Sequence, residues 1–174
     1  PEMIIGTIKE KKKFENRVAI SPEEVKSYLK SGHQVFIERG AGSLSGFTDK
    51  SYKEAGATIS NSKDILKTSD IVIKINCPTP DESRLINNKS MVVSQISTQN
   101  NQDSIKILNS RKVSAFALEL VPRITRAQDM DILSSQANLA GYHAVIDAAQ
   151  EFNRVLPLFM TAAGKVTPAN VLVI

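Results

Sequence analysis

Short apolar stretches alternate with segments of helical pattern along most of the chain. The apolar stretches are rich in β-branched residues and end in polar residues, which is typical of strands buried on both faces. They cover Ile4–Ile8, Val35–Ile37, Asp70–Ile75, Met91–Ile96, Ala115–Leu120 and Val171–Ile174. Alternating strands and helices imply right-handed crossovers. The pattern therefore predicts an α/β fold with a Rossmann-like parallel sheet and helices on both faces.

Helix start signals lie between these strands. Ser21-Pro22-Glu23-Glu24 supplies an N-cap serine, a proline at the first helical position and acids in the first turn, with an end near Ser31-Gly32. Shorter helices are predicted after three further polar residues. They begin after Asp49, Ser62 and Asn101 and run through Ala55, Lys67 and Asn109 respectively.

The longest helix is predicted from Asp131 to about Phe152, where apolar residues recur at three- and four-residue steps. Many of these residues are small, which favours close packing between layers or domains. Beyond it, Thr161–Pro168 is expected to be a turn-rich connector, and Val171–Ile174 to begin a second α/β unit. The alternative is a terminal strand that completes the first sheet.

These patterns divide the chain into three segments. We predict a Rossmann-like domain over residues 1–130, a long interdomain helix with its connector over 131–160, and the start of a truncated second domain over 161–174. The expected glycine-rich turn would follow Val171–Ile174, so the sequence is interpreted as a fragment of a longer chain.

Composition agrees with a globular protein, since 41% of the 174 residues are hydrophobic and 23% are charged. The net charge of +4 invites a nucleic-acid interpretation, but the lysines are scattered. The only dense run, Lys9–Lys13, contains Glu10 and lies in no nucleic-acid-reading motif, which favours a solvated loop. No apolar run is long enough to span a bilayer.

A few residues are candidates for chemistry. Arg17 follows the first strand, where ligand sites of parallel sheets lie, although such a residue is more often simply solvated. Gly40–Phe47 is glycine-rich but lacks a nucleotide-binding spacing, which favours a structural turn. Lys74 lies inside an apolar strand and must reach water, an acid or a ligand. Cys77 is the only cysteine, so it predicts a reducing compartment, no intrachain disulfide and no metal site, and we interpret it as a structural residue.

The most informative segment is Val121–Gln136, which follows a predicted strand and opens the long helix. Its polar groups are placed at a strand end and a helix N-terminus, a location suited to an anion or an amide. Asp131 and Ser134 are three residues apart and therefore share one face of the first helical turn. They can equally serve as N-terminal caps.

Pro122–Tyr142 resembles the NAD(H)-binding domains of proton-translocating nicotinamide nucleotide transhydrogenases, in the alanine dehydrogenase/transhydrogenase superfamily. The resemblance continues through Thr161–Ala169. The front half agrees more loosely in Ile8-Lys9-Glu10, Asn16–Pro22 and Gly40-Ala41-Gly42, a pattern shared with alanine dehydrogenases. The resemblance thus covers nearly the whole chain.

The resemblance implies hydride transfer from NADH to NADP⁺, with NADP(H) held by a partner domain and the reaction coupled to proton translocation by a separate membrane domain. It further implies a homodimer that lies in the cytoplasm at the inner membrane of a bacterium, or on the matrix side in a mitochondrion. Residues 161–174 would then begin the NAD-binding domain. No contact with nucleic acid is implied.

The resemblance also assigns roles in one loop. Arg123 would contact the nucleotide, Asp131 and Ser134 would hydrogen-bond the nicotinamide carboxamide, and Gln128 would reach toward the second nucleotide. Arg123, Gln128 and Asp131 are thus the candidate catalytic residues. Together with Ser134 they are also the expected cofactor-binding residues. Direct hydride transfer needs orientation rather than a general base.

Two alternatives remain. An alanine dehydrogenase would share Arg17 and Lys74, which there resemble contacts to the substrate carboxylate, but it would carry a histidine near Ser94–Thr98, where this sequence has none. Alternatively, the fragment is a non-catalytic structural module, since it lacks the glycine turn that holds pyrophosphate. By itself it is expected to bind NAD weakly and to be inactive.

Overall fold

The computed structural model describes residues 2–173, in which a six-stranded sheet dominates the N-terminal region. Its strands lie in the order β3-β2-β1-β4-β5-β6, and every neighbouring pair is parallel. Their bounds are β1 (Ile4–Thr7), β2 (Gln34–Glu38), β3 (Thr58–Ser60), β4 (Ile71–Asn76), β5 (Met91–Gln95) and β6 (Ser114–Ala117). This is the doubly wound order, in which the chain changes direction between β1 and β4. The predicted Rossmann-like fold is confirmed.

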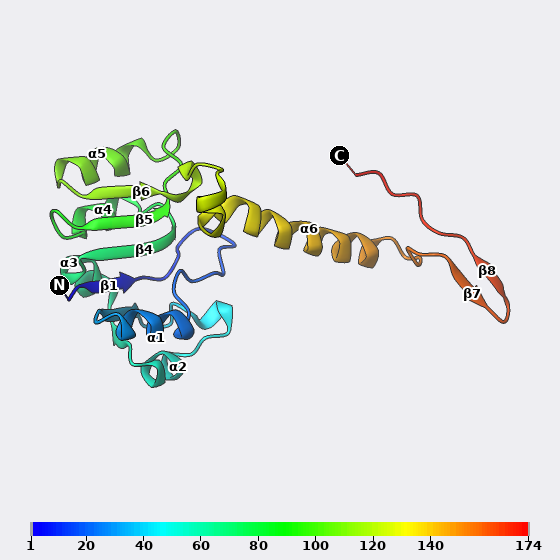
Figure 1. Cartoon of the computed structure of the whole chain (residues 1–174), viewed down its shortest axis with the longest axis horizontal. Helices are drawn as coiled ribbons and strands as arrows, with labels where there is room; N and C mark the ends of the chain where they lie inside the picture. The colour runs from blue at the N-terminus through cyan, green and yellow to red at the C-terminus, as the bar shows by residue number, and fades with distance from the viewer. Residues whose placement is uncertain (1, 174) are drawn as a thin grey trace. The chain divides into compact units, whose positions relative to one another are not determined.

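Helices connect the strands and cover the sheet (Figure 1). They are α1 (Pro22–Lys30), α2 (Asp49–Ala55), α3 (Ser62–Thr68), α4 (Pro80–Leu85) and α5 (Gln102–Ser110). The signals at α1 act as predicted, because Ser21 and Glu24 form a reciprocal capping box and Pro22 is the first helical residue. The helices predicted after Asp49, Ser62 and Asn101 are present within a residue or two of their expected limits.

The two faces of the sheet have separate hydrophobic cores. One core packs α1 and α2 against Ile5, Val35 and Ile37. The other packs α3, α4 and α5 against Val72 and Val92. Both layers thus draw on the strands, which explains why the strands are apolar throughout rather than alternating with polar residues.

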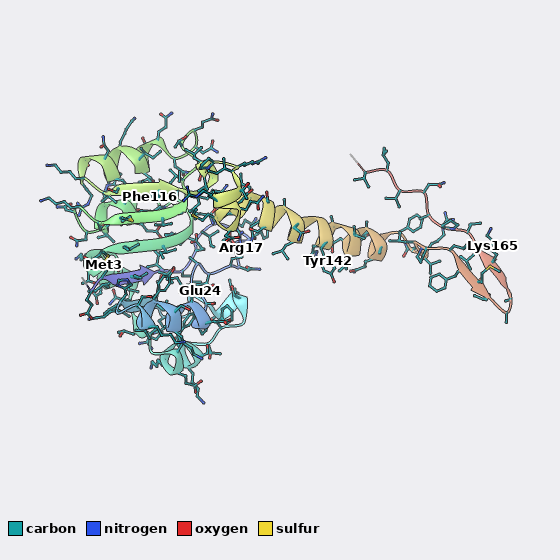
Figure 2. The ribbon with its side chains drawn as sticks, viewed as in Figure 1. Met3, Arg17, Glu24, Phe116, Tyr142 and Lys165 are labelled. Atoms are coloured by element: carbon teal, nitrogen blue, oxygen red, sulfur yellow. The ribbon has the colours of Figure 1, made fainter. Side chains whose placement is uncertain are left out.

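Residues Pro1–Met130 and Asp131–Ile174 form two compact units. The second contains α6 (Ile132–Glu151) and an antiparallel hairpin of β7 (Phe159–Thr161) and β8 (Gly164–Val166). The long helix is therefore present where its periodicity predicts it. Figure 2 shows Tyr142 projecting outward from α6, where its side chain is exposed. None of the described helices combines the length and the apolar character that a membrane crossing requires.

Several local expectations were wrong. Ala115–Leu120 is not one strand, because β6 ends at Ala117 and a 3₁₀ turn covers Leu118–Leu120. The supposed connector Thr161–Pro168 holds β8 and the end of β7. Val171–Val173 has no regular structure in the described residues, where no strand pairs with it, and Ile174 lies outside them.

β3 and α4 were also missed by the sequence analysis. β3 has only three residues and depends on pairing with β2 rather than on a local apolar run. α4 was missed although Thr79 and Glu82 form a capping box around Pro80. The Gly40–Phe47 segment is a structural turn, as expected. A side chain at Gly42 would lie 2.7 Å from the Tyr52 ring.

Candidate functional site

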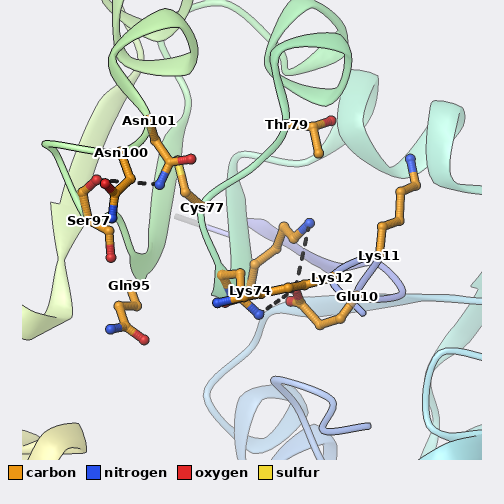
Figure 3. A pocket seen from close by; sticks show the side chains of 11 residues that line it. Glu10, Lys11, Lys12, Lys74, Cys77, Thr79, Gln95, Ser97, Asn100 and Asn101 are labelled. Carbon is orange, nitrogen blue, oxygen red and sulfur yellow. Dashed lines mark hydrogen bonds and ion pairs between the residues drawn. The ribbon is translucent and has the colours of Figure 1, made fainter. Parts of the chain in front are cut away.

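The carboxyl ends of β1, β4 and β5 surround a pocket of about 380 Å³ (Figure 3). The pocket lies where β1 and β4 send their connections in opposite directions, which is the usual ligand position in this sheet order. Charged groups line one side of it and amides or hydroxyls another. The residues used below are Glu10, Lys11, Lys74, Asn76, Gln95 and Ser97.

Lys74 is buried in β4 and is paired with two acids rather than with solvent. Its Nζ lies 2.8 Å from Oε2 of Glu82 and 4.0 Å from Oε2 of Glu10. Burial by itself would raise the pKa of the Glu82 carboxyl, but Lys74 and Lys11 hold this pKa below its usual value. The Nζ of Lys11 lies 2.9 Å from Oε1 of Glu82. Among the possibilities left open by the sequence, the structure supports an acidic partner for Lys74.

Glu10 connects this ion cluster to the backbone of β4. The pairing between β4 and β5 shifts its register between Ile73 and Asn76, so the strand leaves its ladder there. Oε1 of Glu10 accepts a hydrogen bond of 2.8 Å from the backbone N–H of Ile75. The carboxylate thus satisfies a backbone amide beside the irregular strand segment.

Asn76 and Glu15 extend the network to Arg17. The Asn76 amide donates to Glu10 at 3.2 Å and to Glu15 at 3.1 Å. Arg17 binds Glu15 in a bidentate pair of 2.8 and 2.7 Å. The hydrogen bonds from Arg17 are the main reason that the pKa of Glu15 falls to about 2. Glu15 thus links Asn76 at the end of β4 to Arg17.

The end of β5 is ordered by an acid from the 3₁₀ turn after β6. Glu119 accepts hydrogen bonds from the backbone N–H groups of Ile96 at 3.0 Å and Ser97 at 2.6 Å. Ser97 has a positive φ of 48°, which is uncommon for a residue other than glycine. Gln95 and Ser97 therefore present an amide and a hydroxyl toward the pocket, and no histidine lines it among the described residues.

Cys77 is buried at the wall of the same pocket. Burial raises the pKa of its thiol to about 11, so almost no thiolate exists near neutral pH. This agrees with its interpretation as a structural residue.

The loop that carries the predicted cofactor contacts follows β6 at the same edge of the sheet. Pro122 accepts a hydrogen bond from the N–H of Ile124, and a 3₁₀ helix covers Thr125–Met130. Ala127 is buried and anchors this turn, whereas Arg123 and Gln128 are exposed. Burial of Ala127 therefore leaves the side chains of Arg123 and Gln128 on the surface.

Asp131 and Ser134 lie at the start of α6, in the second unit. Oδ1 of Asp131 accepts hydrogen bonds of 3.0 Å from the N–H groups of Leu133 and Ser134. Oδ2 accepts a bond of 2.6 Å from the Ser134 hydroxyl. The two side chains are thus brought together on one face of the first turn, as their spacing predicts, and Asp131 caps the helix. Carboxylate and hydroxyl oxygens can each accept more than one hydrogen bond, so the pair suits an amide donor.

Asn76, Glu10 and Glu82 were not predicted from the sequence as part of the polar network at the carboxyl ends of the strands. In the sequence Glu10 is only one acid within a run of lysines, whereas in the folded chain its side chain is buried. The Thr79-Pro80-Asp81-Glu82 capping pattern was the one signal that could have placed Glu82 on a helix directly after β4.

Known proteins match both the sequence and the fold. The chain is 47% identical over 177 residues to an NAD(P) transhydrogenase alpha-subunit protein of Rhodospirillum rubrum, covering 98% of this chain and 46% of that protein. A crystal structure of transhydrogenase from Sinorhizobium meliloti matches with a TM-score of 0.90 and 44% identity, covering 95% of this chain and 50% of that chain.

Alanine dehydrogenase of Methanococcus maripaludis is a more distant relative. It is 33% identical over 149 residues, covering 85% of this chain and 39% of that protein. The chain spans about half the length of the transhydrogenase relatives. The family model "Alanine dehydrogenase/PNT, N-terminal domain" matches residues 6–140. The shared fold, the matched residues and these identities show that the chain belongs to the alanine dehydrogenase/PNT N-terminal domain family, on its transhydrogenase side.

Proposed function

We propose that this chain belongs to the NAD(H)-binding component of a proton-translocating transhydrogenase. The complete component would support hydride transfer between NADH and NADP⁺, with NADP(H) on a partner domain. The observation that carries the proposal is the paired Asp131 and Ser134 at the start of α6, within the segment that resembles these enzymes. The similarity of the chain to the Rhodospirillum rubrum and Sinorhizobium meliloti proteins supports it.

The residues of this loop fit the nicotinamide end of NAD(H). A carboxamide NH₂ donates two hydrogen bonds, and Oδ2 of Asp131 and the oxygen of Ser134 can accept them. Because Asp131 is already fixed by two backbone N–H groups and one hydroxyl, it offers this site without further ordering. Arg123 would hold the nucleotide, and Gln128 would reach toward the second ring.

These residues would act by orientation. When bound, NADH supplies the hydride, which passes directly to the ring of NADP⁺ without a general base. The reacting carbons must approach to about 3–3.5 Å, so an error in ring placement of about 1 Å can slow the reaction roughly 100-fold. In this proposal Asp131 and Ser134 fix the ring, and Arg123 and Gln128 fix its approach to the partner.

The pocket residues favour a transhydrogenase over an alanine dehydrogenase. Alanine oxidation needs a group that takes up a proton from the reacting oxygen or nitrogen. The pocket offers Gln95 and Ser97 at the end of β5, and neither titrates near neutral pH. Lys74 lines the pocket, but its ammonium is already paired with Glu82 and Glu10.

The further context follows from the proposed function. We expect the component to act as a homodimer, to dock to an NADP(H)-binding domain and to work beside a membrane domain that translocates protons. Its place would be at the inner membrane in a bacterium or on the matrix side in a mitochondrion. The dimer can be checked by sedimentation of the complete component.

The test is Asp131→Asn in the complete component. Asparagine is as good an N-cap as aspartate, so α6 should be retained. The loss of the carboxylate should slow transient-state hydride transfer roughly 10- to 100-fold. Stopped-flow measurement with NADH and NADP⁺ analogues gives this rate.

The matched control is Asp129→Asn, which removes an exposed carboxylate from the same loop and should leave the rate unchanged. Equal transfer rates in the Asp131 variant and the wild type would contradict the assignment of Asp131. Alanine-dependent NADH formation by the wild type, without transhydrogenation, would contradict the proposed function itself.

A further inference from the structure

The lysine run after β1 separates its charges in the folded chain. Glu10 is buried and bound to β4, and Lys11 is paired with Glu82. Lys9, Lys12 and Lys13 are exposed, and none of them takes part in a salt bridge among residues 2–173. The run contains charges of both signs in the sequence, but its solvent-exposed side chains are all positively charged.

Phe14 stands at the tip of this loop in an unfavourable setting. Its side chain is 87% exposed and its φ is +66°, a region in which a bulky residue is strained. The Lys13 ammonium lies 4.8 Å from the ring centroid, and the N–H of Glu15 closes the turn onto the carbonyl of Lys12 at 3.0 Å. Glycine or asparagine would adopt this turn with less strain, so the backbone conformation does not explain a phenylalanine at this position.

The tip lies at the edge of the sheet that also carries the loop with Arg123 and Gln128, two residues of the proposed site. It follows the carboxyl end of β1, and the Pro122–Met130 loop follows the carboxyl end of β6, and in a parallel sheet these ends share one edge. Because hydride transfer requires contact between the rings, the component that carries NADP(H) must dock on this edge. Basic and aromatic side chains are the usual anchors of protein interfaces.

We infer that Lys9, Lys12, Lys13 and Phe14 form a docking tip for the NADP(H)-carrying partner, which would offer acidic groups to the lysines and an apolar pocket to the ring. This inference rests on the proposed function. A protein partner is favoured over a lipid surface because the turn is fixed by Glu10, Glu15 and the Lys12 carbonyl. Because Phe14 is held in a fixed turn, it loses little conformational freedom when it enters a pocket on a protein partner.

The test measures the binding of the complete NAD(H) component to the complete NADP(H)-binding partner by calorimetry. Phe14→Gly should weaken binding about tenfold or more. Its melting temperature should stay equal or rise, because glycine accepts φ +66° without strain. Lys12→Glu with Lys13→Glu should weaken binding by a similar factor and reduce its dependence on salt.

The matched control is Lys50→Glu with Lys53→Glu, the same change of net charge on the exposed face of α2. It should leave the affinity nearly unchanged, and Phe14→Gly should keep the wild-type transfer rate at saturating partner. Unchanged affinity in Phe14→Gly and in the Lys12/Lys13 variant would overturn the docking tip while the proposed function stands. Loss of affinity in the control would also overturn it, since net charge would then explain the effect.

A lipid role gives a different outcome. If Phe14→Gly abolished sedimentation with phosphatidylglycerol vesicles but left partner affinity unchanged, the tip would be a membrane contact and the inference would be wrong. If the wild type neither bound the partner nor transferred hydride, the proposed function would fail as well.

Discussion

At the scale of single residues, the buried cation Lys74 depends on acids from two other elements. Glu82 comes from α4 and Glu10 from the loop after β1, and both carboxylates are as inaccessible as the ammonium. Such a group is tolerated in a strand only while all partners are present. The cluster therefore links the three elements that meet at the switch point of the sheet.

Lys74→Met should lower the free energy of unfolding by about 3 kcal/mol or more, because buried Glu10 loses the ammonium of Lys74 and buried Glu82 keeps only the partly exposed Lys11 as a counter-ion. Urea denaturation measures this. Lys50→Met removes an exposed partner of Glu54 and should change stability by less than about 0.5 kcal/mol. Similar losses in both variants would show that burial of Lys74 has no special importance.

Glu15 should give the fold an acid-sensitive contribution. Its folded pKa of about 2 lies below the usual value of 4.5, so its stabilisation is fully present above the unfolded pKa and is lost as pH falls toward 2. Because the Arg17 side chain is 46% exposed, solvent limits the effect to about 1 kcal/mol. Glu15→Gln should be less stable than wild type at pH 7, and the difference should narrow between about pH 5 and 2 in thermal melts. A difference that is constant with pH would contradict the ionic origin.

At the scale of elements, one glycine decides how closely a helix approaches the sheet. A side chain at Gly6 in β1 would lie 2.2 Å from Oγ of Ser69 and 2.5 Å from Cγ2 of Ile65. Both neighbours belong to α3 or its C-terminal cap, and they are fully buried. The central strand thus lacks a side chain where α3 packs against it.

Gly6→Ala should destabilise the chain by about 1–3 kcal/mol, because the core must shift to admit the methyl group. Thermal unfolding followed by circular dichroism reports the change. Combining it with Ser69→Gly, which removes the nearest atoms, should restore some of the loss. If Gly6→Ala alone matched the wild type, the close approach of α3 would not constrain this position.

At the scale of the whole chain, the core is confined to the first unit. The buried hydrophobic residues of the described chain run from Ile5 to Ala127, and α6 has no buried residue. The two hydrophobic clusters therefore lie entirely within residues 1–130. This distribution indicates that the Rossmann-like unit holds the stabilising contacts of the chain.

A chain that ends at Met130 should therefore fold independently. We expect an α/β circular dichroism spectrum and cooperative melting within about 5 °C of the longer chain, since the truncation removes no core residue. A molten or aggregated product would show that residues 131–174 stabilise the first unit.

Local signals determined much of what could be predicted. The N-cap of α1, the start of α6 and the apolar runs of β1, β4 and β5 depend on residues a few positions apart, so the sequence reveals them directly. The pairing of Asp131 with Ser134 is of the same kind, because one helical turn brings them together. The Rossmann-like class followed from the alternation of strands and helices.

Only the tertiary structure decided the contacts between distant segments. Glu10 reaches Ile75 across 65 residues because β1 and β4 are sheet neighbours, and the strand order cannot be read from any local pattern. The short β3 exists because β2 offers it a partner. The lysine run became purely basic on the outside because folding turned Glu10 inward. In each case the free energy comes from burial and pairing between elements, which appear only when the chain is packed.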